Sequence, residues 1–116
     1  MNTITRTNLL LADCQTPEEL ILKVAQWGRD HNIDDSVMQF AKLNEEVGEI
    51  AHELTRSRFD SDEMEDALGD TAVTLIILAD ILGYNIIDCL AEAYTTIKDR
   101  KGKTKNGSFV KEEDNR

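Results

Sequence analysis

Apolar residues recur every three or four positions along three long stretches of this chain, and this helical spacing is the feature that most limits its fold. No stretch longer than a few residues alternates apolar and polar side chains as a half-buried strand does. We therefore expect four main helices, at about 17–30, 37–56, 62–82 and 86–99. Short connections between them favour an all-α, four-helix bundle-like protomer.

The helix boundaries carry residues that commonly begin and end helices. Thr16 is suited to cap the first helix, with Pro17 in its first turn and Glu19 three residues after the cap. Ser36 is the expected cap of the second helix, and Ser61 or Asp62 is the expected cap of the third. Gly83 is expected to end the third helix.

The first three of these helices each have an apolar stripe that predicts the buried face. The stripes are Leu20, Val24 and Trp27; Phe40, Leu43, Val47, Ile50 and Leu54; and Met64, Leu68, Leu75, Leu78 and Leu82. From Ala72 to Leu82 the third helix is apolar nearly all round, so this half is expected inside the bundle or against another subunit. A chain of 116 residues buries only part of its apolar surface alone, which predicts a homodimer or homotetramer.

Residues 1–100 are expected to form one domain, followed by a basic and polar tail at 101–116. Cys14 and Cys89 lie far apart and have no metal-ligand spacing, so reduced thiols are the default. The apolar runs are too short for a signal peptide or a membrane span. These features predict a cytoplasmic protein without membrane contact.

The charge balance bears on the ligand. Charged residues make up 31% of the chain and the formal net charge is −10. This argues against binding to a nucleic-acid polymer, which requires a basic face. An acidic protein that acts on an anionic substrate needs metal cations to offset the repulsion.

The most informative segment is Lys42-Leu43-Asn44-Glu45-Glu46-Val47-Gly48-Glu49. Glu46 lies at the edge of the apolar stripe, with Glu49 and Glu53 stacked beside it. A second acidic group on the third helix comprises Glu63, Glu65, Asp66 and Asp70. A solvated acidic face is the ordinary explanation of one such helix. Two adjacent acidic helices instead favour a Mg²⁺ site, because hard cations prefer oxygen ligands.

The first segment, followed by Ala67-Leu68-Gly69-Asp70, resembles the paired motif of MazG-like all-α nucleoside-triphosphate pyrophosphohydrolases. The similarity runs over about 39–100 and is nearest to short, phage-type versions. It implies Mg²⁺, with Mn²⁺ as a possible substitute, held by Glu46, Glu49 and Asp70. Ala67 stands where that family has a glutamate. Asp66 is the favoured replacement, with Glu63 as the alternative.

The resemblance implies that a metal-activated water cleaves between the α- and β-phosphates of a nucleoside triphosphate and releases a monophosphate and pyrophosphate. Glu45 or Glu49 is the candidate general base. The candidate phosphate-binding residues are Lys42, Lys98, Arg100 and Lys101. Base specificity does not follow from these residues.

Other interpretations remain open. Glu49-x-x-His52 matches a di-iron motif, but the other histidine, His31, is not preceded by glutamate at the required spacing. A non-catalytic helical regulatory or adaptor protein is the alternative function, and the missing glutamate at Ala67 favours it. Trp27 is expected in the core or an interface more than as a base-stacking residue.

Overall fold

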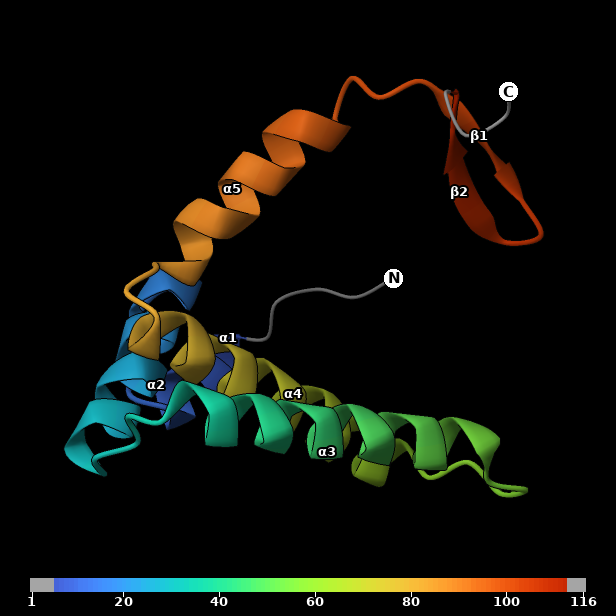
Figure 1. Ribbon diagram of the computed structural model, residues 1–116. Helices are drawn as coiled ribbons and strands as arrows, with labels where there is room; N and C mark the ends of the chain where they lie inside the picture. The colour runs from blue at the N-terminus through green and yellow to red at the C-terminus, as the bar shows by residue number, and fades with distance from the viewer. Residues whose placement is uncertain (1–5, 113–116) are drawn as a thin grey trace. The chain divides into compact units, whose positions relative to one another are not determined.

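The computed structural model describes residues 6–112, which are mostly helical with one small two-stranded sheet (Figure 1). The elements are α1 (Arg6–Leu11), α2 (Pro17–Asp30), α3 (Ser36–Thr55), α4 (Ser61–Ile81), α5 (Ile86–Ile97), β1 (Gly102–Lys105) and β2 (Ser108–Lys111). The four expected helices are present with ends within two residues of the prediction, and α1 was not expected. The chain divides into two compact units, Met1–Ile86 and Ile87–Arg116.

The start of α2 and the end of α4 confirm the sequence signals. Thr16 Oγ1 accepts a hydrogen bond from the Glu19 amide at 3.1 Å, and Pro17 lies in the first turn. Gly83 follows the last turn of α4 with φ of 85°. The Gly83 amide donates a hydrogen bond to the Asp80 carbonyl, and the Tyr84 amide donates one to the Ala79 carbonyl. These two hydrogen bonds form a Schellman motif, which the left-handed conformation of Gly83 permits.

The caps of α3 and α4 lie one or two residues earlier than expected. Asp35, not Ser36, caps α3 and accepts a hydrogen bond at 3.0 Å from the amide three residues on. Asp60, rather than Ser61 or Asp62, caps α4. Its Oδ1 accepts hydrogen bonds from the amides of Asp62 and Glu63 at 3.0 and 3.2 Å. A carboxylate at this position also interacts favourably with the positive end of the helix dipole.

The helices α3 and α4 form an antiparallel hairpin with the most extensive packing between elements (Figure 1). The residues between them, called the seam here, are buried or half-buried and repeat at three- and four-residue steps, as in coiled coils. The seam comprises Gln39, Leu43, Glu46, Ile50 and Glu53 of α3 and Met64, Ala67, Thr71, Thr74, Leu78 and Ile81 of α4. Gln39 Nε2 donates to the Thr74 carbonyl at 3.2 Å and fixes the register.

The predicted apolar stripes of these helices were therefore only partly right. Four of their residues lie in the seam, but the others are exposed, namely Phe40, Val47, Leu54, Leu68, Leu75 and Leu82. Each exposed residue directly follows a seam residue and is rotated from it by about 100°. Each predicted stripe had merged two adjacent faces of one helix.

The helix α2 packs on α4 at Gly28, which is buried against Ile77. Trp27 was expected to be buried, but it is 51% exposed and lies over the His31 ring with centroids 4.1 Å apart. Because Gly28 makes the close approach, the larger neighbouring side chain is left at the rim. The buried apolar residues of the described chain are few: Cys14, Ala67, Ile77 and Ala79.

Enlarging Gly28 is expected to separate α2 from α4. A Cβ at this position would lie 3.1 Å from two carbons of Ile77, so Gly28→Leu should lower the free energy of unfolding by about 1–3 kcal/mol. Gly48 of α3 has open space around it, and Gly48→Leu should raise stability by about 0.5–1 kcal/mol through helix propensity. Urea unfolding followed by circular dichroism measures both, and equal changes would contradict the packing of α2 on α4.

The unit Ile87–Arg116 contains most of α5 and an antiparallel hairpin, which lies within the basic and polar tail expected at 101–116. The strands β1 and β2 pair from Gly102 with Lys111 to Lys105 with Ser108. Asn106 and Gly107, at φ of 52° and 80°, form the two-residue turn that suits strand twist. Residues 113–116 of the predicted tail lie outside the described residues. No single described helix is long and apolar enough to cross a membrane, although α4 and α5 taken together have that length and composition.

Candidate acidic site on the helical hairpin

Glu46 lies in the seam, level with Ala67. The hydrogen bond from Gln39 to Thr74 sets these two residues at the same level of the antiparallel hairpin. Glu46 comes seven residues after Gln39 and Ala67 seven residues before Thr74, so Glu46 and Ala67 are also level with each other. The Glu46 side chain is 14% exposed, and its Oε1 lies 3.4 Å from Lys42 Nζ. A partly desolvated carboxylate therefore faces the position at which the expected glutamate is replaced by a methyl group.

The other predicted ligands lie on one flank of the hairpin. Glu49 directly precedes a seam residue of α3, and Asp66 and Asp70 directly precede seam residues of α4. A preceding residue is rotated by about 100° in the opposite sense to a following one. The two helices run in opposite directions and turn opposite faces to each other. The residues that directly precede seam residues therefore project to the same side of the hairpin on both helices. We call this side the acidic flank, and it includes Glu45 and Glu63.

The carboxylates of the acidic flank are spread along α3 and α4. In the described part of the chain, no three His, Cys, Asp or Glu side chains are grouped closely enough to hold a metal ion. The structure does bring Lys42 to Glu45 at 4.0 Å and to Glu46 at 3.4 Å. The donor chemistry, carboxylate oxygen throughout, matches Mg²⁺ or Mn²⁺.

The remaining basic candidates lie in the other unit. Lys98 and Arg100 follow α5, and Lys101 accepts a hydrogen bond on its carbonyl from the Glu112 amide next to the strand pair. His52, the residue of the di-iron interpretation, is exposed.

A second charged pair near the α3–α4 connection was not predicted. Glu53 is 4% exposed, and Arg56 Nη1 donates to its two carboxylate oxygens at 2.6 and 3.0 Å. The hydrogen bond to Glu53, with the nearby charges of Asp60 and Glu63, raises the pKa of the Arg56 guanidinium. The sequence signal for this pair was the three-residue spacing between Glu53 and Arg56, the residue that follows the end of α3.

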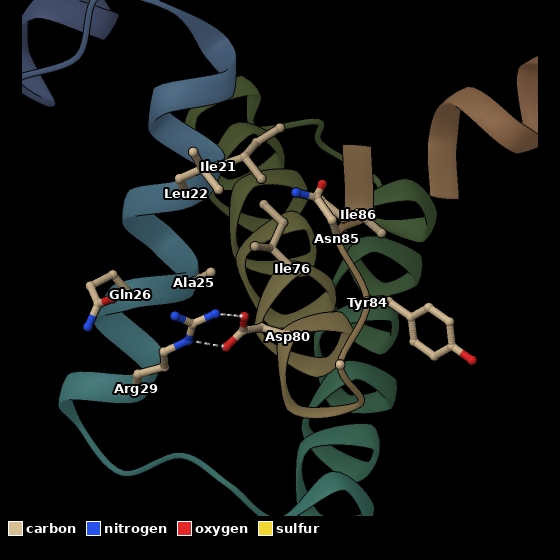
Figure 2. A pocket seen from close by; sticks show the side chains of 11 residues that line it. Ile21, Leu22, Ala25, Gln26, Arg29, Ile76, Asp80, Tyr84, Asn85 and Ile86 are labelled. Carbon is tan, nitrogen blue, oxygen red and sulfur yellow. Dashed lines mark hydrogen bonds and ion pairs between the residues drawn. The ribbon is translucent and has the colours of Figure 1, made fainter. Parts of the chain in front are cut away.

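A groove of about 390 Å³ lies between α2 and the end of α4 (Figure 2). Ile21, Ala25 and Ile76 supply apolar wall, while Arg29 donates to both carboxylate oxygens of Asp80 at 2.5 and 2.9 Å. Asp80 lies ten residues beyond Asp70, about 15 Å along α4, so this groove is separate from the predicted ligands. The ion pair ties α2 to α4 and was not predicted, since the partners are distant in sequence.

The Arg29–Asp80 pair is expected to make stability depend on acid pH. The hydrogen bond from Arg29 lowers the pKa of Asp80 in the folded protein. The ion pair therefore stabilises the fold fully above the pKa of an unfolded-state aspartate, near 3.9, and this stabilisation is lost as the pH falls through the folded-state pKa. Asp80→Asn should therefore lower the melting temperature at pH 7, and the difference from wild type should be smaller at pH 3. Calorimetry at both pH values tests this, and a pH-independent difference would contradict it.

Fold and site together define a small, mostly helical protein whose carboxylates line one flank of an antiparallel helix pair. No protein-family model matches the chain, and no curated protein or solved structure is significantly similar to it. The likeness to MazG-like enzymes therefore rests on the motif residues and their spacing.

Proposed function

We propose that this protein is a Mg²⁺-dependent nucleoside-triphosphate pyrophosphohydrolase that releases a nucleoside monophosphate and pyrophosphate, with Mn²⁺ as a substitute metal. The observation that carries the proposal is the register of the hairpin. Glu46 is level with Ala67 along the hairpin. Glu49 and Asp66 lie within about one helical turn of this level in one direction along the hairpin axis, and Asp70 lies about one turn away in the opposite direction. Both halves of the motif thus share one short stretch of the acidic flank.

The proposed metal ligands are Glu46, Glu49, Asp66 and Asp70. Asp66 takes the place of the missing glutamate because Ala67 points into the seam, whereas Asp66 projects to the flank. Bound Mg²⁺ would neutralise phosphate charge and lower the pKa of a coordinated water. Glu45 is exposed beside this group and is the proposed base, with Glu49 as the alternative.

Lys42 has a role that follows from its contacts. It neutralises Glu46 in the structure at 3.4 Å. A cation bound to Glu46 would compete for the same carboxylate, so Lys42 would become available to a phosphate oxygen of the substrate. Lys98, Arg100 and Lys101 remain proposed contacts for the pyrophosphate.

The test is pyrophosphate release from the canonical ribo- and deoxyribonucleoside triphosphates, with Mg²⁺, Mn²⁺ or EDTA. We expect turnover with either metal and none with EDTA. Absence of turnover from folded protein with every nucleotide would contradict the proposal.

A non-catalytic regulatory or adaptor protein is the second candidate, and the buried Ala67 favours it. Thermal unfolding with and without Mg²⁺ separates the two. The hydrolase predicts a rise in melting temperature that Asp70→Asn removes, whereas an adaptor without a metal site predicts no rise.

A further inference from the structure

The hairpin of β1 and β2 has one face that carries a row of lysines (Figure 1). Successive residues of a strand project to opposite faces, so residues two apart share a face. Lys103 and Lys105 are two apart in β1 and therefore lie on the same face. Lys101 continues the row two residues earlier, where its carbonyl accepts a hydrogen bond from the Glu112 amide in line with the strand pairing. We call this side of the hairpin the lysine face.

The opposite face of the hairpin is occupied by an aromatic ring. Phe109 pairs with Thr104, and its ring lies over Gly102, since a Cβ at Gly102 would be only 2.6 Å from Phe109 Cζ. Lys111 pairs with Gly102 and lies on this second face. The three lysines of the row are all exposed. The hairpin thus presents a row of ammonium groups on one side and a ring on the other.

Positive charge is concentrated in this hairpin and just before it. Residues 98–111 contain six of the 13 lysines and arginines of the chain and a single acidic residue, Asp99. Residues 1–97 contain 19 of the 23 acidic residues, and the net charge of −10 averages over this division. The side chains of Lys101 and Lys103 form no ion pair with any described carboxylate, so their charge is available to a ligand.

We propose that the lysine face binds the phosphate backbone of a single strand of nucleic acid. Two residues of a strand advance about 6.6 Å, so the row distributes three ammonium groups over about 13 Å. Successive phosphates of a nucleic-acid strand are separated by a sugar, and each can meet one lysine of such a row. The phosphates of a nucleoside triphosphate share bridging oxygens and are too close together to meet the three lysines one to one.

A hollow of about 210 Å³ between Lys101 and Lys103 gives room for one phosphate group on this face. The hollow is also lined by Glu112. The carboxylate of Glu112 opposes an anion at this position, because like charges at short distance repel. The lysine face therefore contains one charge whose removal should strengthen binding.

The charge distribution favours a narrow polyanion over a wide anionic surface. A membrane or a nucleic-acid duplex would also come close to the acidic remainder of the chain, whose carboxylates would repel it. A single strand can contact the hairpin alone. Lysine rows that follow a backbone in this way are typical of proteins that bind single strands without sequence preference.

The test is fluorescence anisotropy of labelled oligothymidine and oligouridine, each about 12 nucleotides long, with the full chain. EDTA is present so that no metal bridges the strand to the acidic flank. We expect binding whose affinity falls with salt at a log–log slope of about −2, since three neutralised phosphates contribute about −0.7 each. Binding of either oligonucleotide supports the proposal, and the tighter one identifies the preferred sugar.

Lys103→Gln should reduce the steepness of the salt dependence by about 0.7 and weaken binding on the order of 5- to 10-fold at about 50 mM salt. Lys111→Gln is the matched control, because it removes the same charge from the opposite face of the same hairpin. We expect it to weaken binding by about twofold or less, as screening limits the effect of a charge that makes no phosphate contact.

Glu112→Gln decides the case in which Lys103→Gln disturbs the hairpin. Removal of the Glu112 charge should tighten binding several-fold, a result that loss of structure does not produce. Absence of binding at low salt, equal losses in Lys103→Gln and Lys111→Gln, or an unchanged affinity in Glu112→Gln would overturn the proposal. Tighter binding to phosphatidylserine vesicles, to inorganic polyphosphate or to a DNA duplex than to either single strand would overturn it as well.

Discussion

Glu49→Gln is expected to reduce metal-dependent pyrophosphate release by on the order of 100- to 1,000-fold. The substitution removes one negative charge from an exposed position of α3 and preserves the size of the side chain. In the proposed site this carboxylate holds the metal ion, and the metal offsets the repulsion between the phosphates and the acidic protein. Asp70→Asn makes the corresponding change on α4 and is expected to have an effect of the same size.

Glu65→Gln is the matched control for this prediction. It is the same chemical change on α4, also exposed, but Glu65 follows the seam residue Met64 and so points away from the acidic flank. We expect wild-type activity from it, with melting temperatures of all three variants within a few degrees of wild type because surface substitutions rarely cost more than about 0.5 kcal/mol. Equal losses in Glu65→Gln and Glu49→Gln would mean that overall charge, not a site, governs turnover.

The helices were predictable from the sequence because their signals are local. Thr16, Pro17 and Gly83 mark helix ends by their own conformational preferences. The hairpin of β1 and β2 had a local signal as well, since Asn106-Gly107 is the strongest short turn sequence for paired strands. The basic composition around that turn was taken for a tail.

The seam was not predictable, because polar residues occupy it. Gln39 is buried through a bond to the Thr74 carbonyl, and Glu53 through Arg56. Glu46 is covered with Lys42 beside it. Hydropathy ranks such residues as exposed, yet a local partner removes much of the cost of burial. Assignment of the large apolar residues to the buried face instead placed six of the ten on the wrong face.

The candidate site shows the same division. The motif located the carboxylates along the chain, but their placement on one flank depends on antiparallel pairing and on the register set by Gln39 and Thr74. The ion pair of Arg29 with Asp80 joins residues distant in sequence and had no local signal. Sequence therefore identified the acidic residues, and tertiary packing decided which of them share a surface.

Ala67→Glu is expected to make the stability of the protein dependent on metal. Ala67 is 5% exposed and level with the half-buried Glu46. A glutamate there would bring a second carboxylate into the seam, where burying an uncompensated charge costs roughly 3–5 kcal/mol. That is a large part of the 5–15 kcal/mol that stabilises a typical domain, so the variant should unfold at much lower temperature in EDTA.

Mg²⁺ should reverse this loss if the seam edge next to Glu46 belongs to the metal site. A cation shared by the two carboxylates removes their repulsion, and binding at 100 times the dissociation constant restores about 2.7 kcal/mol. Ala93→Glu, an exposed position of α5, adds the same charge and should respond to neither EDTA nor Mg²⁺. Thermal unfolding in both conditions measures the difference. An Ala67→Glu variant that Mg²⁺ fails to stabilise would place the cation away from Glu46 and remove this residue from the proposed ligands.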